Sequence, residues 1–132
     1  MNVKKLLLAG VAVGVVMNIV DFVVQGQLLM GYYSQFSFFR KEMPVQWFVI
    51  GDFVAALVFV WVYDRVFSSF GGGPKGGATF GLYAGVLVNF PTWIFTYLLI
   101  DGFTYGLAWV WTAIGIVWGV IAGAVAGAVY KK

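Results

Sequence analysis

The amino-acid sequence predicts an all-α integral membrane protein whose four transmembrane helices form two tandem helical hairpins. Hydrophobic residues make up 62% of the 132-residue chain and charged residues only 10%, whereas about a quarter of the residues in soluble domains are charged. The mean hydropathy of +0.94 indicates the same class of protein. Four apolar stretches each reach the length of about 20 residues that a helix needs to cross a bilayer. The two halves of the chain also resemble each other, which predicts the tandem arrangement.

The predicted transmembrane helices cover residues 6–30, 45–67, 78–100 and 107–130. The segment between the first two helices, residues 31–44, is polar and aromatic. We expect it to lie along the membrane interface, because aromatic rings are enriched at the level of the lipid headgroups. A tight turn at residues 101–105 joins the last two helices.

A glycine-rich segment separates the two hairpins. Residues 68–77 contain the run GGGPKGG, which predicts a flexible linker because Gly and Pro are poor helix formers. The chain then divides into a first hairpin at residues 1–67, this linker, and a second hairpin at residues 78–132. Together they are expected to form one compact domain.

The basic residues predict how the helices are oriented. One side of the predicted membrane carries Lys4, Lys5, Arg65, Lys75, Lys131 and Lys132. The other side carries Arg40 and Lys41 beside the acidic Glu42 and Asp101. Because cytoplasmic loops have an excess of Lys and Arg, the pattern predicts a plasma or inner membrane location with both termini in the cytoplasm. At the cytoplasmic end of the second helix, Asp64 and Arg65 are expected to form a solvated pair.

An internal repeat emerges when the second half of the chain is aligned without gaps on the first. In and just after the first helix of each half, Gly10, Gly14, Val15, Asn18, Leu28 and Gly31 align with Gly81, Gly85, Val86, Asn89, Leu99 and Gly102. In the second helix, Trp47, Val49, Ile50, Val54, Ala55 and Val58 align with Trp118, Val120, Ile121, Val125, Ala126 and Val129. Each half contains an even number of helices, so the halves share one orientation. The repeat therefore predicts a pseudo-twofold axis along the membrane normal.

Polar residues predict a site in the interior of the bundle. On the first helix, Asn18 and Asp21 follow Gly10 and Gly14 at spacings of three or four residues, which places these residues on one face. Asn89 and Thr92 form the corresponding stripe on the third helix. We expect the two stripes to meet near the bundle axis, because hydrocarbon offers polar groups no hydrogen bonds.

Two carboxyl groups are central to the functional prediction. At 1.5 Å per residue, Asp21 and Asp52 each lie roughly 12 Å below the outer boundary, level with Thr92 and one turn from Asn18 and Asn89. No basic residue shares that depth. A carboxyl group without a cationic partner keeps its proton or binds a cation. These five residues are therefore the candidate ligand- or ion-binding site, and the alternative is that they only hold the helices together.

Two further features concern helix shape and packing. Pro91 is expected to kink the third helix and free the carbonyl of Leu87, either to complete a coordination shell or only to shape packing. The fourth helix has glycines at every fourth position, a pattern that lets two helix backbones approach closely. These are Gly115, Gly119, Gly123 and Gly127. The partner helix could belong to the same chain or to a second copy.

The composition also excludes several functions. The chain has no Cys and no His, which excludes disulfides, zinc–thiolate sites and Ser–His or Cys–His catalysis. The run GGGPKGG lacks the residue order of a phosphate-binding loop. We predict no catalytic residue, metal site, cofactor or nucleic-acid partner. Two functions remain: a small transport or solute-binding protein, and a non-catalytic accessory subunit of a membrane complex. Either lies in a lipid bilayer, with a homo-oligomer or another membrane protein as a possible partner.

Overall fold

The computed structural model describes residues 1–131 and consists of helices joined by turns and loops, with no strand in that range. Its elements are α1 Val3–Val23, the π-helix η1 Val24–Leu28, α2 Met30–Tyr33, α3 Val45–Phe70, α4 Gly73–Leu99 and α5 Tyr105–Val129. Because η1 continues α1, four helices are long and apolar enough to cross a membrane. This confirms the prediction of four such helices. Of the predicted cytoplasmic lysines, Lys132 lies outside the described residues.

The predicted linker at residues 68–77 is wrong, because all but two of its residues are helical. α3 continues to Phe70 and α4 begins at Gly73. The turn between them relies on glycine, since φ is 77° at Gly71 and 80° at Gly73, a region that other residues avoid. A Cβ at Gly77 would lie only 1.9 Å from the carbonyl oxygen of Gly123 on α5. Close packing therefore outweighs the low helix propensity of this segment.

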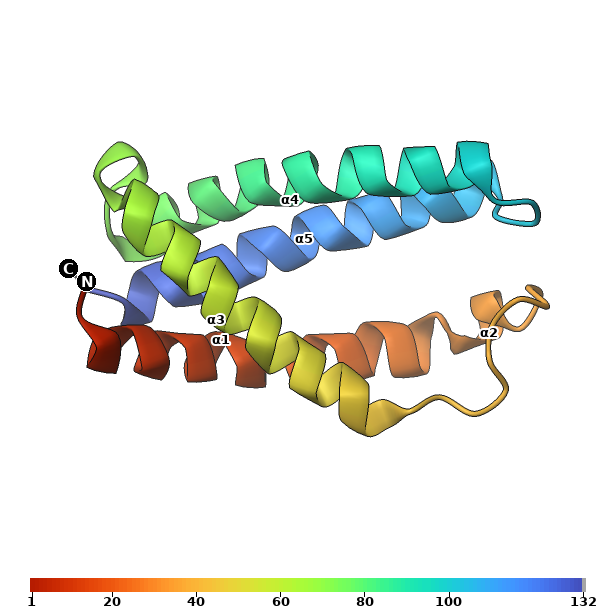
Figure 1. Cartoon of the computed structure of the whole chain (residues 1–132), viewed down its shortest axis with the longest axis horizontal. Coiled ribbons are helices and arrows are strands. Elements are labelled where there is room, and N and C mark those ends of the chain that lie inside the picture. Colours follow the sequence, from red (N-terminus) through yellow and green to blue (C-terminus); the bar gives the residue numbers. More distant parts are fainter. Residues whose placement is uncertain (132) are drawn as a thin grey trace.

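α4 and α5 lie side by side along their length (Figure 1). A Cβ at Gly81 would lie 1.8 Å from the carbonyl oxygen of Gly119, and one at Gly119 would lie 2.3 Å from the carbonyl oxygen of Gly81. The two backbones are thus in direct contact. In the described residues, the glycine face of α5 packs against a helix of the same chain.

α1 and α3 pack differently, because they cross at an angle (Figure 1). Their contact also involves glycines of α1, but the opposing groups on α3 are large side chains. A Cβ at Gly10 would lie 2.5 Å from the side chain of Leu57, and one at Gly14 would lie 2.3 Å from that of Phe53. The contact is therefore between the glycine-lined backbone of α1 and large side chains of α3.

α5 contacts both α1 and α4, whereas α1 and α4 do not contact each other in residues 1–131. The expectation that the polar stripes of α1 and α4 meet near a common axis is therefore wrong. The reason is geometric: the glycine-lined contact binds α4 to one side of α5, and α1 occupies another side.

Two hydrophobic clusters form the core. The terminal cluster lies near the two chain ends and consists of Ala9, Val13, Met17, Ala56, Val60, Tyr63, Phe80, Ala122, Ala126 and Tyr130. The aromatic cluster lies toward the opposite end and is built on Tyr33, Phe103, Leu107 and Ala108, with Trp93 and Trp111 packed against them. In the chain, Asp21 follows Met17 of the first cluster and precedes Tyr33 of the second, which belongs to α2. The candidate site therefore lies between the two clusters along the sequence.

Candidate functional site

Asp21 of α1 and Asp52 of α3 lie together where the two helices cross, as their depths predict. Their side chains interact directly, and the side chain of Trp118 on α5 also interacts with Asp21. Both aspartates are half-buried. The close contact of Gly14 with Phe53, the neighbour of Asp52, brings α3 onto α1 two turns from Asp21. Three helices thus contribute one side chain each to a polar centre.

Asn18 lies one turn from Asp21 on α1. Its side-chain amide donates a hydrogen bond of 2.9 Å to the carbonyl of Gly14, so this donor is used within its own helix. The equivalent Asn89 on α4 makes the same bond to the carbonyl of Gly85, also at 2.9 Å. The two predicted repeats therefore share one local interaction, although their helices pack differently.

Asn89, Thr92 and Pro91 lie away from the carboxyl pair, on α4. A Cβ at Gly115 would lie 2.0 Å from Oδ1 of Asn89, so Asn89 covers this glycine of α5. The same oxygen accepts a 3.2 Å hydrogen bond from Nε1 of Trp93. Thr92 is exposed and donates to the carbonyl of Val88 in its own helix. α4 passes through Pro91 without interruption. Placing Asn89 and Thr92 at the centre required α4 to face α1, which it does not.

An apolar cavity of about 190 Å³ lies between the first span and α5, and it is open on the side of the exposed Ala113 and Val117. Its lining comprises Val20, Val24, Ala113, Ile114, Val117 and Trp118. Trp118 is shared, since it lines the cavity and interacts with Asp21. Sequence reasoning missed this cavity, because the packing of α1 on α5 follows from no motif.

A chain of hydrogen bonds links the first span to α5 on the side of the aromatic cluster. The hydroxyl of Tyr33 donates to Oε1 of Gln25 in η1 and accepts a 2.8 Å bond from Nε1 of Trp111. Burial raises the pKa of the Tyr33 hydroxyl, and the bond from Trp111 opposes this change. Sequence reasoning missed the role of Tyr33, because Trp111 lies 78 residues away. The rings of Tyr33 and Phe39, 5.0 Å apart, attach the loop after α2 to the same cluster.

We expect Tyr33→Phe to lower the free energy of unfolding by about 1 kcal/mol, because it breaks both hydrogen bonds and keeps the ring. Thermal unfolding of the detergent-solubilised protein, followed by circular dichroism, measures this loss. Tyr32→Phe is the matched control and should leave stability within about 0.5 kcal/mol of wild type. Equal losses in the two variants would show that the hydrogen bonds of Tyr33 contribute nothing to stability.

At the end near the chain termini, Asp64 is buried and not a solvated partner of Arg65. Its side chain is 3% exposed and accepts a hydrogen bond from the hydroxyl of Tyr130. Arg65 instead lies over the ring of Trp61, 5.3 Å from the ring centroid. The solvated pair was expected because the two residues are adjacent at a helix end. On a helix, however, consecutive side chains point about 100° apart.

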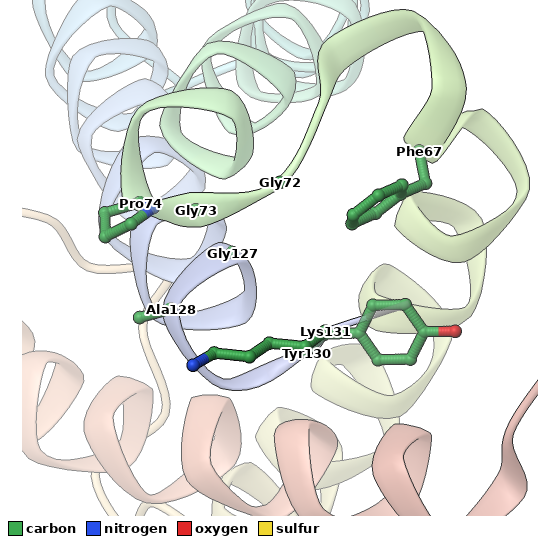
Figure 2. Close-up of a pocket in the computed structure, with 8 residues that line it drawn as sticks. All are labelled: Phe67, Gly72, Gly73, Pro74, Gly127, Ala128, Tyr130 and Lys131. Carbon is green, nitrogen blue, oxygen red and sulfur yellow. The ribbon is translucent and has the colours of Figure 1, made fainter.

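A second cavity, of about 520 Å³, lies at this same end (Figure 2). It is bordered by Phe67, Gly72, Gly73, Pro74, Gly127, Ala128, Tyr130 and Lys131. Figure 2 shows the rings of Phe67 and Tyr130 on one side and Pro74 and Ala128 on the other. None of the five residues predicted for the binding site lines it.

Within residues 1–131, no group of three or more His, Cys, Asp or Glu side chains could hold a metal ion. The candidate site therefore consists of two acidic side chains, Asp21 and Asp52, and the indole of Trp118. Comparison with models of protein families, with curated proteins and with solved structures finds no match to this chain.

Proposed function

We propose that this protein binds a small cation or a proton between Asp21 and Asp52 and carries it across the membrane, without catalysing a chemical reaction. The observation that supports this most directly is the contact between the two carboxyl groups, which come from different helices. The proposal also agrees with the general rule that acidic side chains within membrane spans mark ion or proton pathways.

Electrostatics explains why this pair requires a positive charge. Two carboxylates in contact repel each other strongly where the surroundings are apolar, and neither is well solvated there. One proton or one cation between them removes most of this repulsion. In α1 and α3 the basic residues Lys4, Lys5 and Arg65 stand near the ends of the helices, so a mobile positive charge is the simplest counterion.

The proposal also includes the orientation and origin of the chain. Both termini and the turn between α3 and α4 lie at one end of the molecule (Figure 1), and this end carries most of the basic residues. We place it in the cytoplasm of the cell. The equivalent bonds of Asn18 and Asn89 support descent of the two hairpins from one duplicated hairpin. In this account, the second copy has Thr92 and Gly123 at the positions of Asp21 and Asp52, and it gained a glycine-lined contact.

Flux measurements in liposomes test the proposed transport. We expect Asp21→Asn and Asp52→Asn each to reduce proton or monovalent-cation flux at least tenfold, because each removes half of the charge that attracts the cation. Asp101→Asn is the matched control: it removes the same charge from an exposed turn and should leave flux unchanged. Wild-type flux no greater than that of empty liposomes would reject transport.

A second candidate function is a non-catalytic accessory subunit of a larger membrane complex. It is favoured by the first two turns of α3, where residues 45–51 are exposed on every face of the helix. Gly51 has no atom within 4 Å of the position of an added Cβ, so another protein could approach there closely. Purification in mild detergent distinguishes the two functions, because a stoichiometric partner supports the subunit and isolation of this chain alone opposes it.

A further inference from the structure

We propose that the cation bound at this site is a small organic ammonium ion, with its charge at Asp21 and Asp52 and its alkyl groups in the apolar cavity beside Trp118. This inference rests on the proposed cation site and specifies its ligand. It is drawn from the position of the cavity, its lining and its volume.

The position of the cavity connects it to the carboxyl pair. Val20 immediately precedes Asp21, and Val24 lies one turn further along the same span, where the π-helix begins. Trp118 borders the cavity and also interacts with the carboxyl group of Asp21. A ligand in the cavity therefore contacts the indole ring that also interacts with Asp21, and its charge lies on the side of the cavity next to the carboxyl pair in the proposed binding mode.

The lining favours an alkylammonium ion over a metal ion. Hard metal cations require several oxygen ligands in a defined geometry, whereas the six residues around the cavity contribute aliphatic side chains and one indole. An alkylammonium ion carries its charge on apolar groups, which gain from burial against such side chains. Tryptophan is also the aromatic residue that attracts cations most strongly, and aromatic sites recognise quaternary ammonium groups.

The volume limits the size of the ion. The cavity measures about 190 Å³, below the range of about 300–1,000 Å³ for drug-sized ligands. At about 30 Å³ for each water-sized group, it holds roughly six such groups. Tetramethylammonium, with one nitrogen and four carbons, fits this space. Tetrabutylammonium is too large to lie wholly within it.

Binding of tetramethylammonium to the purified protein in phosphatidylcholine nanodiscs tests the inference by calorimetry. We expect saturable binding that Asp21→Asn weakens at least tenfold. Ala113→Leu fills the cavity and should weaken binding similarly. Ala55→Leu, at another exposed alanine, is the matched control and should bind like wild type.

Two further probes separate charge from shape. Tert-butanol has a similar size to tetramethylammonium but no charge, so it should not bind. Val117→Ala should enlarge the cavity and therefore improve the binding of tetraethylammonium relative to wild type. Because this test expects a gain of binding, a misfolded variant cannot produce the expected result. The inference is overturned if tetramethylammonium fails to bind, if Ala113→Leu binds it as wild type does, or if tert-butanol binds equally well.

The same experiments distinguish this inference from the proposed transport. Carboxyl-dependent proton flux without tetramethylammonium binding would retain the transport proposal and reject the organic cation. Carboxyl-dependent binding without any flux would support the assigned site and reject transport.

Discussion

Replacing Gly81 with alanine is expected to destabilise the protein by about 3 kcal/mol, the upper end of the usual range for overpacking. The added Cβ would lie 1.8 Å from the carbonyl oxygen of Gly119 and 2.6 Å from its carbonyl carbon. These are backbone atoms in the middle of α5, so no side chain can rotate away to make room. α4 and α5 must separate, and the contact is lost along neighbouring turns as well. The free energy of unfolding in mixed micelles, titrated with a denaturing detergent, measures the loss.

Gly51→Ala is the matched control for this prediction. Gly51 also lies inside a long helix, but a Cβ there has no atom within 4 Å. Because Ala is a better helix former than Gly by about 1 kcal/mol, this variant should be as stable as wild type or slightly more so. If Gly81→Ala and Gly51→Ala had the same stability, the direct contact between the α4 and α5 backbones would be wrong.

The number and approximate extent of the long helices could be predicted from the sequence, because each span must satisfy its backbone hydrogen bonds internally and be apolar over its whole length. The boundary between α3 and α4 could not be predicted in this way. Helix propensity argued against a helix at Gly76 and Gly77, and the contact of Gly77 with Gly123 reversed that preference. Such a contact depends on the partner helix, which local sequence does not specify.

The candidate site was predictable only in part. The depths of Asp21 and Asp52 along their helices were sufficient to place the two carboxyl groups together. Asn89 and Thr92 were assigned to the same layer on the assumption that equivalent helices of a repeat pack equivalently. That assumption failed because Gly10 faces a leucine whereas its equivalent, Gly81, faces a glycine. The size of the opposing residue decides whether two helices cross or run alongside each other. Identical residues in the two repeats do not show which residue lies opposite each of them.

Buried polar partners far apart in the chain were beyond sequence reasoning. Asp64 and Tyr130 are separated by 66 residues, and neither belongs to a recognisable motif. Their burial is nevertheless nearly complete, at 3% and 1% exposure. A hydrogen bond to a charged group in such surroundings contributes more to stability than one at the surface.

Tyr130→Phe is therefore expected to reduce the free energy of unfolding by about 2 kcal/mol, within the range of about 1.5–3 kcal/mol for hydrogen bonds to charged groups. The ring remains in the terminal cluster, so the loss isolates the hydroxyl that joins the end of α5 to α3. Detergent titration at neutral pH, as for Gly81→Ala, measures it. Tyr83→Phe is the control, because Tyr83 is 64% exposed and its variant should match wild type.

The pH dependence of stability gives an independent measurement of the same contact. Burial raises the pKa of Tyr130 to about 12, and the hydrogen bond to Asp64 acts in the same direction. An unfolded tyrosine has a pKa near 10, so the folded state holds this proton more tightly than the unfolded state. The stability that Tyr130 contributes is then complete below about pH 10 and is lost as the pH rises toward 12. Tyr130→Phe lacks this titration, so its stability should fall less than that of wild type across the same range. Parallel decreases in the two proteins would mean that the Tyr130 hydroxyl is not held by Asp64 in the folded state.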